Sequence, residues 1–174
     1  MCFNIKFVLF QAEDDLEIET LESLIMVADI HAERIRMAFR RLDAFLPLTE
    51  EMLNNLSEEN LGFLEILTSR FGKLQDLIGA AIFPMILKKL EVDIAYFSLI
   101  DCLNRLEKLG FLESADIWRQ IRGVRNKVVH EYPLSKEKAL KNLEEIIEQT
   151  QALLNYWKFL RNEITQRVII GERL

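Results

Sequence analysis

The stretch RNKVVHEYP, residues 125–133, holds the side chains of this chain that are best suited to chemistry. Arg125 carries a planar guanidinium that can bind two oxygens of a phosphate or a carboxylate. His130 is one of only two histidines, and its imidazole titrates near neutral pH, so it can act as a general acid or base. Asn126 adds an amide next to Arg125, and Tyr132 adds a phenol two residues beyond His130. Together these side chains predict a site near the C-terminal end of a helix.

The helix that carries these residues has an apolar face and a polar edge when its positions are placed at intervals of about 100°. The apolar face is expected to join the core, and it comprises Ile117, Ile121, Val124 and Val128, with Trp118 and Val129 on its flanks. The polar edge comprises Arg119, Arg122, Asn126 and His130. Arg125 falls at the margin of the apolar face, where a charge is costly unless it meets a carboxylate, a cleft or a second subunit. Its position alone leaves two interpretations open: a functional site, or a paired or snorkelling arginine beside a histidine that caps the helix.

A second group of charged residues lies in the stretch SRFGKLQDLIG, in which Arg70, Lys73 and Asp76 follow one another at spacings of three. We interpret them as structural support, with Asp76 paired to an arginine so that the second helix is fastened to the fourth. A catalytic role for the group is the alternative. His31 is interpreted as a residue without companions, an ordinary surface or core histidine.

The composition fits a single helical domain that spans residues 1–174. Half of the residues are hydrophobic and 29% are charged, which excludes a disordered chain. The net charge of −6 argues against a general nucleic-acid coat protein, but it leaves room for a local basic cleft. The cysteines and histidines are too few and too far apart for a zinc site, so we expect no metal and no other cofactor. Free thiols favour a cytoplasmic protein.

No apolar run approaches the roughly 20 residues that a membrane-spanning helix needs, so we expect no membrane partner. The N-terminal stretch MCFNIKFVLF is apolar, but Lys6 interrupts it, and it is interpreted as an ordered arm.

The hydrophobic patterns and the helix-capping residues predict an all-α fold. Expected helices cover residues 14–43, 58–90, 93–109, 114 to a point before Pro133, and 135–168. Thr49, Ser57 and Ser135 are cap candidates, and Ser114 or Glu113 is expected to open the fourth helix. Gly110 is the expected glycine after the third helix, and Pro84 is expected to kink the second helix or to lie near its end. The last helix carries an apolar stripe, with Trp157 and Phe159, that is expected to join the core. Short loops between amphipathic helices predict an antiparallel up-and-down four-helix bundle with an extra helix or an N-terminal arm.

The spacing Arg125, four residues, His130, one residue, Tyr132 matches the Arg-x4-His-x-Tyr signature, so the chain resembles the HEPN superfamily. More narrowly it resembles the HepT-like toxins, which pair with MNT-type minimal nucleotidyltransferases. Asn126 after the arginine is also typical of them. The blocks RFGKLQDLIG, LIDCLNRLEKLGF and WRQIRGVRNKVVHEYP extend the resemblance to one long HEPN subgroup over much of residues 47–133. This chain is longer than the compact HepT toxins, with extra sequence at both ends.

The resemblance implies a homodimer with a four-helix core and a metal-independent endoribonuclease site in a cleft shared by two subunits. Arg125 would bind the phosphate, His130 would transfer protons, and Asn126 would orient the phosphate or the histidine. The RNA, mRNA or tRNA, would be held by a local positive charge from Arg119, Arg122, Arg125 and Lys127. Attack by the 2′-OH would give a 2′,3′-cyclic phosphate and a 5′-hydroxyl.

The resemblance also implies regulation by a nucleotidyltransferase antitoxin, which would transfer AMP onto Tyr132 and so block the cleft with bulk and negative charge. Two alternatives remain. The chain is a non-catalytic HEPN subunit that binds nucleotide or substrate for a separate nucleotidyltransferase, or it is a helical scaffold without a site.

Overall fold

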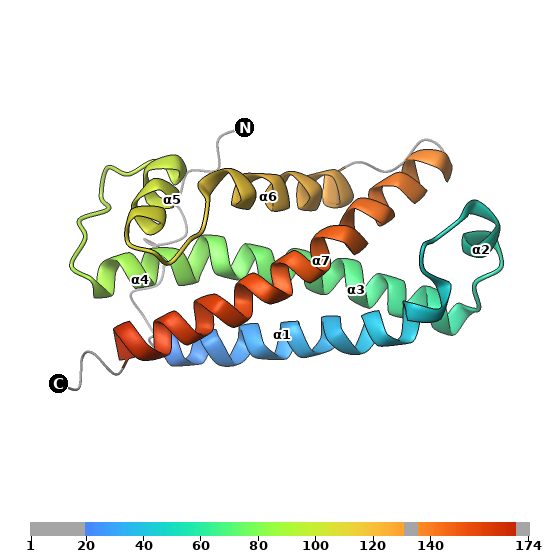
Figure 1. The fold of residues 1–174 in the computed structure, drawn as a ribbon, viewed down its shortest axis with the longest axis horizontal. Coiled ribbons are helices and arrows are strands. Elements are labelled where there is room, and N and C mark those ends of the chain that lie inside the picture. Colours follow the sequence, from blue (N-terminus) through green and yellow to red (C-terminus); the bar gives the residue numbers. More distant parts are fainter. Residues whose placement is uncertain (1–19, 131–135, 170–174) are drawn as a thin grey trace, which may run out of the picture.

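The computed structural model describes residues 20–130 and 136–169, and these fold into helices joined by turns (Figure 1). The described residues form α, 3-10 and π segments and contain no β-strand, which confirms the all-α class for this part of the chain. The expected N-terminal arm and residues 14–19 of the first expected helix lie outside the described residues.

Helix α1 spans Leu21–Leu42 and begins at a capping box formed by Thr20 and Ser23. The Ser23 amide donates to Thr20 Oγ1, and the Thr20 amide donates to Ser23 Oγ, so two amides at the helix start are satisfied by side chains. One face of the helix is buried from end to end. That face packs mainly against α3, which runs beside α1 along the length of the molecule (Figure 1).

A 3-10 turn at Asp43–Phe45 and the short helix α2, Glu50–Asn54, connect α1 to α3, Glu58–Leu77. The hydroxyls of Thr49 and Ser57 cap α2 and α3, in agreement with the sequence. Helix α2 itself was not expected, because five residues are too few to show an amphipathic period.

The second expected helix is continuous in path, but it divides into α3, a π segment at Ile78–Ile82, and α4 at Phe83–Lys89. Pro84 explains the division. Its ring has no amide hydrogen and would clash with the carbonyl four residues earlier, at Ala80, in a regular α-helix. The π segment ends just before Pro84 and widens the helix at that carbonyl.

Helix α5 spans Leu99–Lys108, so the expected start at residue 93 is wrong. Ser98 and Asp101 form a capping box at its N-terminus. This local pair of hydrogen bonds fixes the start of the helix, in preference to the weaker helical pattern of the residues before Ser98. Glu91 has a φ of 57°, which also interrupts any helix through this region. Gly110 follows the helix with a φ of 74°, as expected of the residue after the C-cap.

Helix α6 spans Ala115–His130, and the Ser114 hydroxyl accepts hydrogen bonds from the amides of its first turn, as the sequence predicted. Helix α7 spans Lys136–Ile164 and continues as a π segment at Thr165–Ile169; its expected cap, Ser135, lies outside the described residues. Helix α3 contacts α1, α6 and α7, and α6 contacts α7. Position 125 of α6 therefore lies where this helix packs against the centre of the fold.

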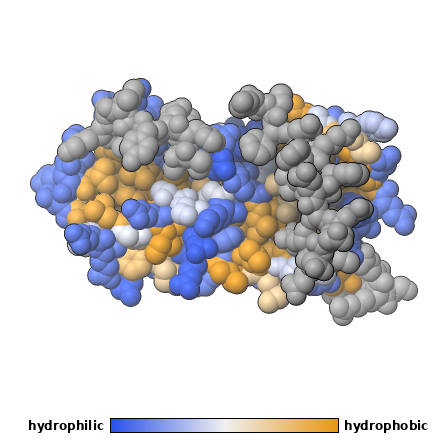
Figure 2. Space-filling model, turned by 180° about the vertical axis from the view of Figure 1, so that it is seen from behind, coloured by the Kyte–Doolittle hydropathy of each residue, from blue (hydrophilic) through white to orange (hydrophobic). Residues whose placement is uncertain are grey.

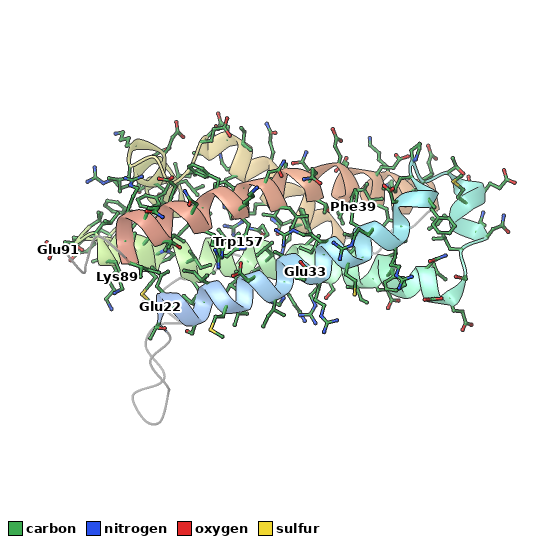
Figure 3. All side chains as sticks on the ribbon, turned by 60° about the horizontal axis from the view of Figure 1, so that its bottom comes forward. Glu22, Glu33, Phe39, Lys89, Glu91 and Trp157 are labelled. Carbon is green, nitrogen blue, oxygen red and sulfur yellow. The ribbon has the colours of Figure 1, made fainter. Side chains whose placement is uncertain are left out.

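The core is rich in aromatic rings where α4, α6 and α7 meet. The ring centroids of Phe83 and Trp118 are 4.8 Å apart, and those of Trp118 and Tyr156 are 5.6 Å apart. Trp157 is buried between α7 and α1, and its indole N–H donates to Asp29 of α1 at 3.0 Å (Figure 3). The Asp29 carboxylate also accepts from Arg161, so one surface acid ties the two helices together.

Two apolar residues that were expected in the core are partly exposed. Ile117 is 44% exposed and Phe159 is 42% exposed, whereas Ile121 and Trp118 are buried as expected. Both exposed residues border a groove between α6 and α7. Other residues of the same two helices make the contact with the core. None of the described helices is both long enough and apolar enough to cross a lipid bilayer.

Candidate functional site

Arg125 lies on α6 against α3, at a point where α3 has a glycine. A Cβ added at Gly72 would lie 3.7 Å from Cγ of Arg125, so the aliphatic stem of the arginine packs directly on α3. The arginine is 21% exposed, which places its head at the surface and its stem in the seam between the two helices. The position at the margin of the apolar face that the sequence predicted is thus the α3–α6 seam.

The guanidinium of Arg125 is held by two oxygens. Its Nη2 donates to Oδ2 of Asp76 on α3 at 2.5 Å, and its Nη1 donates to Oδ1 of the adjacent Asn126 at 3.1 Å. Asp76 is 48% exposed, so the ion pair is open to solvent on the side of the carboxylate. The contact joins α3 to α6 and gives Asp76 the arginine partner that the sequence suggested. It also keeps the charged fork of Arg125 at the surface.

The α3–α6 seam also contains buried polar atoms without partners. They are Nε of Arg125, Oε1 of Gln75 and Nε1 of Trp118, and none has a hydrogen-bond partner among the described residues. Gly79 lies beside the last two: a Cβ there would be 3.5 Å from Nε2 of Gln75 and 3.7 Å from Nε1 of Trp118. Gln75 and Trp118 thus lie near each other beside Gly79, which the sequence did not reveal because they approach only in the folded chain.

The remaining residues of the motif are located only through the backbone. His130 is the last residue of α6, but the side chains of His130 and Lys127 lie outside the description, and Tyr132 lies outside the described residues. Five residues of α-helix correspond to a rise of about 7.5 Å and a turn of about 140°. Positions 125 and 130 of one chain thus face different sides of α6.

The other arginines of the expected basic edge differ in their surroundings. Arg119 is exposed and pairs with Asp116 one turn earlier on the same helix. Arg122 is half-buried and has no ion pair within the described part of the chain. Arg122 is therefore the more available of the two for an anion.

Arg70 and His31 meet across the α1–α3 contact, although 39 residues separate them in the sequence. Nη1 of Arg70 lies 3.1 Å from Nδ1 of His31, and since the guanidinium can only donate, Nδ1 is the acceptor. Partial burial, followed by the charges of Arg70 and Lys73, lowers the pKa of His31 below its ordinary value. The interpretation of His31 as a residue without companions is wrong, because its companions lie on another helix.

The lowered pKa of His31 predicts a pH-dependent contribution to stability. The unfolded chain binds a proton on this imidazole more readily than the folded chain, so the stabilising contribution is complete above the ordinary pKa of 6.5 and is lost as the pH falls through the lowered pKa. Between about pH 7.5 and pH 5, the melting temperature of the wild type should therefore fall further than that of His31→Gln, which keeps an acceptor but does not titrate. Parallel melting curves for the two proteins over this range would contradict the prediction.

The described residues offer no group of three or more His, Cys, Asp or Glu side chains that could hold a metal ion. A groove of about 420 Å³ lies on the other side of α6, between α6 and α7, and its walls include Ile117, Trp118, Tyr156 and Phe159. The walls are mostly apolar and include none of the charged residues of the α3–α6 seam.

No family model, no curated protein and no solved structure matches the chain. The assignment of a function therefore depends on the residues of the site and on their arrangement.

Proposed function

We propose that the chain is a HepT-like toxin of the HEPN superfamily and acts as a metal-independent endoribonuclease. The observation that carries the proposal is the environment of Arg125, the first residue of the Arg-x4-His-x-Tyr motif. Its guanidinium is held at the surface of the α3–α6 seam by Asp76 and Asn126 and is oriented rather than sealed in the core. An oriented and partly exposed guanidinium suits a phosphate that carries extra charge in the transition state.

The reaction needs proton transfer and charge stabilisation, and no group beyond the RNA and the protein. The 2′-oxygen bonds to phosphorus while a base removes its proton, and the bond from phosphorus to the 5′-oxygen breaks while an acid protonates that oxygen. His130 acts as base or acid, because an imidazole titrates near neutral pH. Arg125 binds the oxygens of the phosphate, and Asn126 orients the phosphate or the histidine. The products are a 2′,3′-cyclic phosphate and a 5′-hydroxyl.

A homodimer is part of the proposal because α6 turns positions 125 and 130 away from each other within one chain. In a symmetric pair, the two copies of α6 bring an arginine and a histidine from different subunits to a common cleft. The long segments α1, α3 with α4, α6 and α7 would form the antiparallel four-helix core of each subunit. Symmetry would also double the local positive charge of Arg122, which offsets the net charge of −6 at the cleft.

An MNT-type nucleotidyltransferase is the proposed antitoxin, with Tyr132 as the residue that accepts AMP. The tyrosine follows the last turn of α6 by two residues, so a phosphate ester on it would carry negative charge to the cleft and compete with RNA for the arginines.

The proposal is tested by incubating the protein with single-stranded RNA and with tRNA in the presence of a metal chelator. We expect cleavage at an unchanged rate, with fragments that end in a 2′,3′-cyclic phosphate and begin with a 5′-hydroxyl. Cleavage that stops when the metal is removed, or fragments with 5′-phosphates, would contradict the mechanism. Absence of cleavage, together with co-purification of a small nucleotidyltransferase, would favour the non-catalytic partner subunit. The Asp76 ion pair also suits that alternative, because it occupies the guanidinium without substrate.

A further inference from the structure

Arg70 is positioned by a neutral group, which is unusual for a half-buried arginine. Its hydrogen-bond partner is Nδ1 of His31, and an imidazole that accepts at Nδ1 is uncharged. No carboxylate pairs with Arg70 within the described part of the chain. An acid would orient a guanidinium and also cancel its charge, whereas a neutral imidazole orients it and leaves the charge intact. The Arg70 head is therefore a fixed, uncompensated cation.

Lys73 extends this positive charge along α3. It lies three residues after Arg70, it is exposed, and it has no ion pair among the described residues. The field of the two cations is felt by His31, since both charges lower the pKa of its imidazole. A further three residues along α3, Asp76 holds Arg125 of the proposed cleavage site. The charged residues thus form a row across α3, from its contact with α1 to its contact with α6.

The row extends over less than two turns of α3. Six residues separate Arg70 from Asp76, which corresponds to about 9 Å along α3. Helix α3 runs behind α7 in Figure 1, and Figure 2 shows the molecule from behind. In that view, hydrophilic residues lie in the middle of the face, between hydrophobic areas. In a chain with a net charge of −6, two cations that have no ion pair among residues 20–130 and 136–169 indicate a local anion site near Arg125.

We propose that Arg70 and Lys73, with His31 as the residue that orients Arg70, bind phosphates of the RNA strand next to the one that is cleaved. This inference rests on the proposed function and adds a substrate path to it: the strand leaves the cleft at Arg125 and crosses α3 toward α1. The residues that the sequence suggested as structural support thus divide into two roles. Asp76 holds Arg125, whereas Arg70 and Lys73 contact the substrate.

The test measures RNA binding separately from cleavage. A fluorescent single-stranded RNA of about 20 nucleotides is titrated with the His130→Ala protein, with and without Arg70→Gln and Lys73→Gln, at several salt concentrations. Each phosphate contact to a single strand contributes about 0.7 to the slope of log affinity against log salt. We expect the double substitution to weaken binding on the order of 10-fold and to reduce the slope by about 1.4. Lys73→Gln alone should reduce the slope by about 0.7, half of the reduction expected for the double variant. Because Lys73 is exposed, this variant tests the path without risk to folding.

Lys158→Gln is the matched control, because Lys158 is an exposed lysine of α7, a helix that contributes no residue to the row, and it should leave the slope unchanged. In the protein with an intact His130, the double substitution should raise KM for the long RNA by a larger factor than it lowers kcat. Full affinity and an unchanged salt slope in the variants, with cleavage intact, would overturn the substrate path and leave the proposed function standing. A wild-type protein that neither binds nor cleaves RNA would overturn both.

Discussion

Replacing His130 by alanine is expected to slow RNA cleavage by about 10²- to 10⁴-fold, because in the proposed mechanism its imidazole supplies the proton transfer. The loss should fall on kcat, since the phosphate contacts of the arginines remain. The measurement is the initial rate of cleavage of an end-labelled single-stranded RNA with a metal chelator present. The rate of the wild type should also depend on pH near neutrality, and this dependence should disappear in the variant.

Two controls make the His130 result specific. Lys158→Gln, an exposed substitution on α7, should cleave at the wild-type rate. The melting temperature of His130→Ala should stay close to that of the wild type, because the substituted residue is the last of α6. Cleavage within about twofold of the wild type would exclude His130 as the acid or base.

The helices of this fold could be predicted where their ends are set by local chemistry. Thr49, Ser57 and Ser114 each cap a helix with a hydroxyl, and Gly110 takes the positive φ that ends α5. These interactions join residues a few positions apart, so the sequence contains all the information that they need.

Other features could not be predicted because they depend on competition between neighbouring segments. Helix α5 starts at residue 99 and not at the expected residue 93, because the capping box of Ser98 and Asp101 outweighs the helical pattern of residues 93–98. The π segment before Pro84 relieves a clash that a hydropathy pattern does not register. Ile117 and Phe159 have helical spacings typical of core residues, and only the packing of α6 on α7 shows that they border a groove.

The candidate site divides in the same way. The marginal position of Arg125 follows from helical spacing, and it predicted that the arginine would need a partner. That Asp76 is this partner follows from the packing of α6 on α3, with 49 residues between the two. The contact of His31 with Arg70 left no trace in the sequence, because two residues on separate helices form no pattern that spacing can detect.

Arg125→Ala is the variant with the second large expected effect, and it acts on both activity and stability. Removing the guanidinium should lower kcat by about 10²- to 10³-fold, because the negative charge of the transition state loses a hydrogen-bond donor. It should also lower the free energy of unfolding by about 1–2 kcal/mol, because the ion pair with Asp76 and the packing of the stem on Gly72 are lost. The exposure of Asp76 keeps this cost moderate, since solvent screens the pair and rehydrates the carboxylate.

Substitutions at Asp76 separate the two effects of Arg125. Asp76→Ala removes the same ion pair but leaves the guanidinium, so its loss of stability should approach that of Arg125→Ala while its loss of cleavage is much smaller. In the double variant the stability losses should be less than additive, since both substitutions break one contact. Chemical denaturation and cleavage rates of the four proteins provide the cycle. If Arg125→Ala loses stability but keeps its cleavage rate, the arginine is a clasp between α3 and α6, and the anion that it binds is the carboxylate of Asp76 alone.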